Sequence, residues 1–155
     1  MSATIWPAPV RRGVRVKATP ERAFEVFTAQ FGRWWPKSHH IGKSPMSGGM
    51  IEPKVGGRWY ETCEDGSQCD WGKVLVWEPP RRLVLAWHLS ASFQYDPGLG
   101  VEVEVRFTPE GDATRVDLEH RNLELFGPDA EKMQASFGSP GGWPSILDSY
   151  AATVA

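Results

Sequence analysis

Two ionisable residues occupy strand positions from which their side chains should point into the protein. His120 shares a predicted strand face with Leu118, and Glu61 shares one with Trp59, because residues two apart lie on the same face of a strand. An inward imidazole can act as a general acid or base, and a buried carboxylate needs a partner or its pKa rises. We predict that Glu61 pairs with His120 in a pocket, with Lys73 or a polar ligand group as alternative partners. The competing interpretations are a structural core histidine and a glutamate on the solvent side.

The remaining histidines are weaker candidates for chemistry. His39 and His40 lie in a loop at 37–50 that is rich in serine, glycine and proline. Adjacent side chains point apart, so these two are poor joint metal ligands, and we expect one of them, His39, to face a cavity. The alternative is a solvated loop pair. His88 should lie opposite Trp87 and be exposed.

The two cysteines, Cys63 and Cys69, flank a turn at 64–67. A disulfide across this hairpin is geometrically possible, but a reducing cytosol favours free thiols. A zinc site needs two more ligands and no second cysteine pair occurs, so we expect no metal and no cofactor. The sequence also lacks a Ser-His-Asp order, a nucleophile elbow and a phosphate-binding loop.

Size and charge narrow the classes of function. The chain has 155 residues and a net charge of -2, which argues against a nucleic-acid surface or a polybasic membrane patch. No apolar run approaches the roughly 20 residues that span a bilayer, and the start of the chain lacks a signal-peptide pattern. We therefore expect a cytoplasmic protein, monomeric or homodimeric, with one domain at 10–154 after a lead-in at 1–9.

Aromatic residues are unusually frequent, with 8 Trp, 7 Phe and 3 Tyr. Large flat rings are well suited to wall an internal cavity, although an ordinary aromatic core is the alternative. The candidate wall residues are Trp35, Trp59, Trp71, Trp87, Phe93, Phe137, Trp143 and Tyr150. Phe93 and Tyr95 could also form a lid over the entrance.

Strands must position most of these side chains. Residues 71–87 predict two paired strands, with Pro79-Pro80 outside the pairing and Trp71, Leu75 and Trp77 on one face. Residues 101–108 alternate strictly between apolar and polar residues, which is typical of a half-buried strand. The acidic residues of this strand and of the last one should be solvated: Glu102, Glu104, Asp117 and Glu119.

Helices should cover one face of the sheet. Thr19 and Pro20 form a helix start, and a second short helix is expected through Trp34. The sequence Ser139-Pro140 predicts the start of a long terminal helix that ends near 154. The resulting fold class is α+β: a curved antiparallel sheet of about six or seven strands wrapped around the C-terminal helix, with two short helices after the first strand. Such a sheet leaves a gap against its helix.

Several motifs occur in an order typical of one superfamily. They are Thr-Pro-Glu-Arg-Ala-Phe at 19–24, Trp-Trp-Pro at 34–36, Val-Gly-Gly-Arg-Trp-Tyr-Glu at 55–61, Trp-Gly-Lys-Val at 71–74 and Glu-Pro-Pro-Arg-Arg-Leu-Val-Leu-Ala-Trp at 78–87. With these motifs the chain resembles the START/Bet v-like helix-grip superfamily (SRPBCC), and within it the branch named after the activator of heat-shock-protein ATPase (AHSA-like). The resemblance implies a helix-grip fold in which the loop at His39 forms one rim of the pocket.

The superfamily includes lipid and hormone carriers, polyketide cyclases, ring-hydroxylase subunits and co-chaperone domains, so three functions follow as hypotheses. We favour binding of a small, mostly apolar or aromatic ligand that Glu61 and His120 contact without catalysis. One alternative is a protein-interaction domain with a filled core, such as a chaperone-associated protein of the stress response. Another is a cyclase- or hydrolase-like enzyme that uses Glu61 and His120 as its acid and base.

Overall fold

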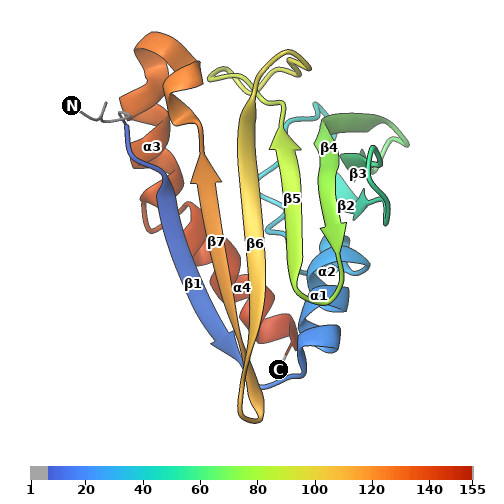
Figure 1. Ribbon diagram of the computed structural model, residues 1–155. Helices are drawn as coiled ribbons and strands as arrows, with labels where there is room; N and C mark the ends of the chain where they lie inside the picture. Colours follow the sequence, from blue (N-terminus) through green and yellow to red (C-terminus); the bar gives the residue numbers. More distant parts are fainter. Residues whose placement is uncertain (1–6, 155) are drawn as a thin grey trace, which may run out of the picture.

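The computed structural model describes residues 7–154, and the first six residues of the expected lead-in lie outside this range. Within it, seven strands form one antiparallel sheet in the order β1-β7-β6-β5-β4-β3-β2 (Figure 1). The strands are β1 (Val10–Val16), β2 (Met46–Ile51), β3 (Arg58–Cys63), β4 (Gln68–Glu78), β5 (Arg82–Trp87), β6 (Val101–Glu110) and β7 (Ala113–Arg121). The predicted α+β fold with about six or seven antiparallel strands is confirmed.

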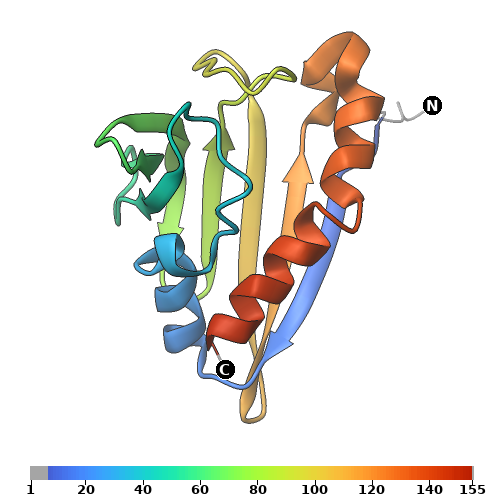
Figure 2. The same ribbon diagram turned by 180° about the vertical axis from the view of Figure 1, so that it is seen from behind.

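The helices lie together on one face of this curved sheet (Figure 2). They are α1 (Pro20–Thr28), α2 (Phe31–Trp34), the 3-10 helix η1 (Leu123–Asp129), α3 (Ala130–Gly138) and α4 (Trp143–Val154). Helices α3 and α4 follow each other across a bend and run along the side of the sheet that carries β1 and β7. This is the helix-grip arrangement, in which the inner face of the sheet is turned toward the helices.

The start of α1 follows the predicted cap. Thr19 Oγ1 accepts a hydrogen bond of 3.2 Å from the backbone N–H of Arg22, and Pro20 occupies the first helical turn, where a missing N–H does no harm.

The terminal helix starts later than predicted. Residues 139–142 form a turn in which the N–H of Gly142 donates to the carbonyl of Ser139, so α4 begins at Trp143. A Cβ on Gly142 would lie 2.4 Å from the carbonyl oxygen of Phe137. Only glycine fits this close approach of α3 to α4, and this requirement sets the bend between the two helices.

Strand β4 does not keep a simple alternation. The expected common face of Trp71, Leu75 and Trp77 is wrong, because Trp71 is buried whereas Leu75 is 41% exposed. The pairing of β4 with β3 shifts opposite Trp59, and its pairing with β5 shifts between Val74 and Val76. Each bulge adds one residue to β4 and reverses which side chains point inward.

Two residues expected at the surface are buried. Glu104 accepts hydrogen bonds from Arg82, Arg106 and Arg121 on the outer face of the sheet. Burial alone would raise the pKa of Glu104, but these arginines outweigh it and lower the pKa to about 2. His88 is buried because its carbonyl accepts a hydrogen bond from Asp96 N, which folds the loop at 90–100 over it. Burial lowers the pKa of His88.

Among residues 7–154, no helix combines the length and the apolar character needed to cross a bilayer.

Candidate functional site

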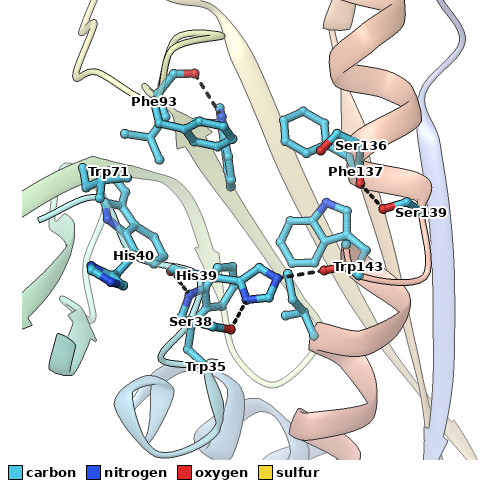
Figure 3. A pocket seen from close by; sticks show the side chains of 16 residues that line it. Trp35, Ser38, His39, His40, Trp71, Phe93, Ser136, Phe137, Ser139 and Trp143 are labelled. Carbon is cyan, nitrogen blue, oxygen red and sulfur yellow. Dashed lines mark hydrogen bonds between the residues drawn. The ribbon is translucent and has the colours of Figure 1, made fainter. Parts of the chain in front are cut away.

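A cavity of about 420 Å³ lies between the inner face of the sheet, the turn that joins α3 to α4, and the loop that follows α2 (Figure 3). Its volume falls in the range of roughly 300–1,000 Å³ that is usual for small-molecule pockets. The gap that the sequence predicts between sheet and helix is therefore present, and it is not filled by side chains.

Aromatic side chains form most of the cavity wall. The structure brings six of the predicted wall residues to it: Trp35, Trp71, Trp87, Phe93, Phe137 and Trp143. They come from the loop after α2, from β4 and β5, from the loop after β5, and from α3 and α4. Segments distant in sequence thus contribute rings to a single wall.

The wall rings support one another through edge contacts. Trp35 lies with its ring centroid 5.0 Å from that of Trp71 and 5.8 Å from that of Trp143. Trp87 meets Phe137 edge-on at 5.3 Å. Tilted and edge-to-face arrangements at these distances are favourable, so the rings are held in place before any ligand enters.

His39 joins two sides of the cavity. Its Nε2 lies 2.8 Å from the carbonyl oxygen of Gly141, and its Nδ1 lies 2.9 Å from Ser38 Oγ. A carbonyl oxygen only accepts, so Nε2 carries the proton and Nδ1 accepts from the serine hydroxyl. Trp35 Nε1 also donates to the carbonyl of His39 at 2.8 Å. His39 therefore lies in the cavity wall and fixes the rim loop to the α3–α4 turn.

His120 lies behind the wall, not on its surface. Its Nδ1 accepts a hydrogen bond of 3.0 Å from Trp143 Nε1, and its ring stacks on Phe137 at 4.1 Å. Burial lowers the pKa of His120 to about 3. The ring is thus neutral at pH 7, and its contacts show that it orients Trp143. Its Nε2 has no hydrogen-bond partner within residues 7–154.

The predicted pairing of Glu61 with His120 is wrong. Glu61 Oε1 accepts from Ile41 N at 2.7 Å and from Trp71 Nε1 at 2.9 Å, and Oε2 accepts from Gly42 N at 3.3 Å. Strand β3 is separated from β7 by β4, β5 and β6, which corresponds to about 19 Å along the sheet.

Two further predicted wall residues lie away from the cavity. Trp59 is buried behind Trp71 and Trp87, with ring centroids at 5.5 Å and 5.7 Å. Tyr150 is buried at the other end of α4, where its hydroxyl donates to the carbonyl of Ala23 at 2.7 Å. Both belong to the core that supports the site.

Several polar groups at the cavity were missed from the sequence. Ser136, Ser139 and the backbone of the glycines at 141–142 line it beside His40. No local pattern marks the two serines, since their position depends on the bend between α3 and α4. The Gly-Gly pair was the available signal for that bend.

A second apolar depression, of about 650 Å³, lies at the far end of the molecule between α1, β2 and the β4–β5 turn. Phe24 and Trp77 form part of its floor, with Pro79 and Pro80 at its edge. Its acidic groups, Glu21 and Glu25, are exposed to solvent. It lacks the ring of four tryptophans found at the first cavity, which we therefore take as the candidate site.

Comparisons with known proteins agree with this architecture. A family model described as "Activator of Hsp90 ATPase homolog 1-like protein" matches residues 17–155. A comparison with curated proteins returned no match.

Two solved structures are similar over almost the whole chain. An anthrahydroquino-γ-pyrone synthase, Txn09, described as complexed with SUM, is 38% identical; the match covers 96% of this chain and 97% of that one with a TM-score of 0.67. CalC from Micromonospora echinospora, described as a self-sacrificing resistance protein, is 34% identical, with coverage of 95% and 94% and a TM-score of 0.70. Protein MLL2253 from Mesorhizobium loti is 21% identical, with coverage of 93% and 94% and a TM-score of 0.67, and shows the shared fold alone.

Proposed function

Because this chain belongs to the family of activator of Hsp90 ATPase homologue 1-like proteins, we propose that it uses the cavity of the shared fold to bind a small, flat, mostly apolar ligand with aromatic rings. The family description alone does not select between a ligand-binding protein and a chaperone-associated one. The observation that carries the proposal is the unfilled cavity of about 420 Å³ with four tryptophans in its wall.

The wall favours aromatic over aliphatic ligands. Trp35, Trp71, Trp87 and Trp143 present fixed ring faces and edges to the cavity. A ring system gains about 0.5–1.5 kcal/mol for each well-placed aromatic contact beyond what its buried area provides, and an alkyl chain does not. A planar ligand can therefore make several such contacts at once.

The polar groups at the wall suit oxygen substituents. The hydroxyl of Ser139 already donates to the carbonyl of Ser136 at 2.7 Å, which leaves its oxygen lone pairs free to accept. His40 lines the cavity with 30% of its side chain exposed and can meet a hydroxyl or keto group. We propose that the ligand is a hydroxylated or keto-bearing fused-ring compound. The name of the 38% identical synthase refers to an anthrahydroquinone and a pyrone, and this supports the proposed class of ligand.

Calorimetric titration with 1,8-dihydroxyanthraquinone tests the proposal, with dodecanoic acid as an apolar ligand without rings. We expect saturable binding of the quinone at one site per chain and at least tenfold weaker binding of the fatty acid. Equal affinity for the two compounds, or no binding of the quinone, would contradict the proposal.

Two exposed aromatic residues of one loop provide a matched pair of variants. Phe93 is 43% exposed and lines the cavity, whereas Tyr95 is 42% exposed and does not. Phe93→Ala should weaken quinone binding about 5- to 10-fold, which corresponds to roughly 1–1.4 kcal/mol for one lost ring contact. Tyr95→Ala should leave the affinity unchanged. A loss of the same size in both variants would indicate a general effect of the loop.

A ring-forming reaction in the same cavity is the second candidate. It is favoured by one observation, the 38% identity to a protein described as a synthase. Incubation with the substrate of that synthase, followed by mass spectrometry, tests it. Formation of the cyclised product would support catalysis, and recovery of unchanged substrate by a protein that still binds the quinone would restrict the function to binding.

A further inference from the structure

A second cluster of reactive side chains lies beside the cavity, on the hairpin formed by β3 and β4. We propose that Glu61, Cys63 and Cys69, together with His40, bind a zinc ion. This inference goes beyond the proposed ligand binding and does not depend on it. It also revises the expectation of no metal, which rested on the cysteine pair alone.

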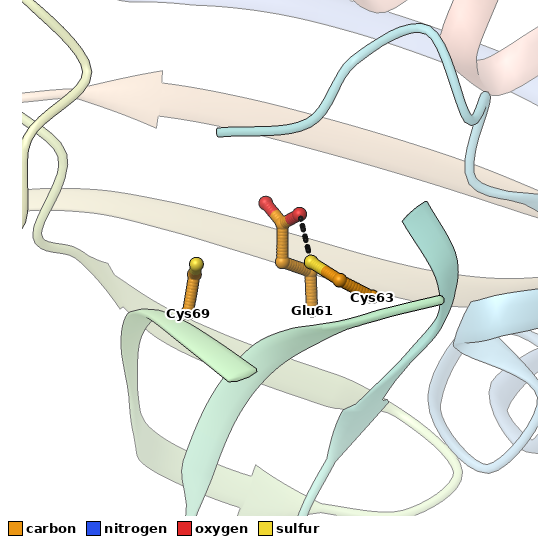
Figure 4. A group of neighbouring side chains, drawn as sticks. All are labelled: Glu61, Cys63 and Cys69. Carbon is orange, nitrogen blue, oxygen red and sulfur yellow. Dashed lines mark hydrogen bonds between the residues drawn. The ribbon is translucent and has the colours of Figure 1, made fainter. Parts of the chain in front are cut away.

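The strand pairing brings the first three ligands together. Glu61 and Cys63 are two residues apart on β3 and so project from the same face, and Glu61 pairs directly with Cys69 on β4. Figure 4 shows the two sulfur atoms on either side of the carboxylate. The ligand atoms of the three residues all lie within 4.8 Å of one another, and Cys63 Sγ is 3.4 Å from Glu61 Oε2.

The fourth ligand comes from the loop after α2. His40 Nδ1 lies 3.9 Å from Glu61 Oε2. Zinc binds sulfur at about 2.3 Å and nitrogen or oxygen at about 2.0–2.1 Å in tetrahedral geometry, which places ligand atoms roughly 3.3–3.8 Å from one another. The separations of Cys63 Sγ and of His40 Nδ1 from Glu61 Oε2, 3.4 Å and 3.9 Å, are close to these values. His40 lies outside the group of three whose ligand atoms are all within 4.8 Å, so its ring must move toward the two sulfur atoms to complete the site.

The charge of Glu61 points independently to a cation. Its side chain is 0% exposed, and its donors are all neutral: Ile41 N, Gly42 N, Trp71 Nε1 and the thiol of Cys63. Within residues 7–154, no lysine or arginine reaches ion-pair distance of this carboxylate, and His40 is the one basic side chain that does. Buried charges are normally paired or coordinate a metal, and a zinc ion would supply the missing positive charge.

The surroundings also fit a metal with thiolate ligands. Gly42 closes one side, since a Cβ there would lie 2.6 Å from Cys63 Sγ and 3.4 Å from Cys69 Sγ. The partly exposed His40 leaves a route for the ion from the aromatic cavity.

Titration of the reduced, metal-free protein with Co²⁺ tests the site, because cobalt reports thiolate and tetrahedral ligation in its absorption spectrum. We expect a thiolate-to-cobalt charge-transfer band and intense visible bands that saturate at one equivalent and disappear when Zn²⁺ is added. Thiol titration should find two reactive cysteines before Zn²⁺ and protected ones after it. Absence of a charge-transfer band with both thiols reduced would overturn the proposal.

Variants separate ligation from a folding defect. Cys69→Ser changes a partly exposed residue and should weaken cobalt binding and reduce the charge-transfer band, because one of the two thiolates is lost, while the far-ultraviolet circular dichroism is kept. Glu61→Gln should weaken cobalt binding at least tenfold, and the matched change of a neighbouring exposed residue, Glu64→Gln, should not alter it. An unchanged cobalt spectrum in Cys69→Ser, or in wild-type protein whose cysteines have been oxidised to a disulfide, would overturn the assignment.

Discussion

At the level of single residues, His120 shows how a titratable side chain can serve the cavity without entering it. Its neutral ring accepts the indole hydrogen of Trp143 and stacks on Phe137, and both of these rings face the cavity. A protonated ring at this position would lose its acceptor atom. The hydrogen bond that orients Trp143 therefore requires the imidazole of His120 to remain uncharged.

The stability of the protein should fall in acid because of this histidine. The pKa of His120 is about 3 in the folded protein against 6.5 for a free side chain. Between these values the unfolded chain binds a proton that the folded protein does not, so stability is complete above pH 6.5 and decreases as the pH falls toward 3. The full loss is on the order of 5 kcal/mol. His120→Gln should flatten the free energy of unfolding measured in urea between pH 7 and pH 4.5.

Some slope should remain in His120→Gln, because the lowered pKa of the buried His88 acts with the same sign. His88→Gln is the matched variant and should remove the smaller part of the slope. If His120→Gln kept the whole pH dependence of the wild-type protein, the neutral, buried state of His120 would be wrong.

Sequence alternation predicted the inward direction of Glu61 and His120, because this depends only on local strand geometry. It could not predict their partners, which depend on strand order and on where loops cross. Glu61 is held by the loop at Ile41 and by Trp71 on the next strand. The proximity of His40 to Glu61 was missed for the same reason, because no local sequence pattern places the two residues near each other.

At the level of strands and helices, the alternation of apolar and polar residues predicted the buried face correctly where strands are regular. It predicted the wrong face where strands contain bulges. Strands β6 and β7 pair in unbroken register, as their alternation indicated. The two bulges of β4 carry no clear sequence signal, and they moved Leu75 to the surface. The outer face of the sheet was expected to be solvated, but Arg82, Arg106 and Arg121 cover Glu104 there.

This arginine cluster should stabilise the sheet in a pH-dependent way. The pKa of Glu104 is lowered to about 2 from 4.5, so its contribution is complete above pH 4.5 and is lost as the pH falls toward 2. Glu104→Gln should cost on the order of 3 kcal/mol at pH 7 and only about 1 kcal/mol at pH 2.5. Urea unfolding at the two pH values measures this. Glu110→Gln, which removes an exposed pair with Arg15, should change stability by less than about 0.5 kcal/mol. Equal effects of the two substitutions at pH 7 would contradict the role of Glu104.

The bend between α3 and α4 offers another comparison between neighbouring positions. A Cβ on Gly142 would clash with the carbonyl oxygens of Phe137 and Ser136 at 2.4 Å and 2.5 Å, whereas a Cβ on Gly141 would meet nothing within 4 Å. Gly142→Ala should lower the free energy of unfolding by about 1–3 kcal/mol and weaken quinone binding, because the cavity wall shifts. Gly141→Ala should be close to neutral in both measurements. Tolerance of Gly142→Ala would show that the bend does not need this close contact.

At the level of the whole molecule, the loop after α2 connects the sheet to the helices. It reaches the α3–α4 turn through His39 and the β3–β4 hairpin through Glu61. The resemblance predicted the helix-grip architecture and the place of this loop at the rim. The shape and openness of the cavity could not be predicted, because they depend on how six aromatic rings from six segments pack together.

The most direct test of the proposed function is the crystal structure of the protein in complex with 1,8-dihydroxyanthraquinone. We expect the ring system to lie in the cavity between β5 and the α3–α4 turn, in contact with Trp35, Trp87 and Trp143. Binding of the quinone in the depression beside Phe24 and Trp77, with the tryptophan-lined cavity left empty, would contradict it.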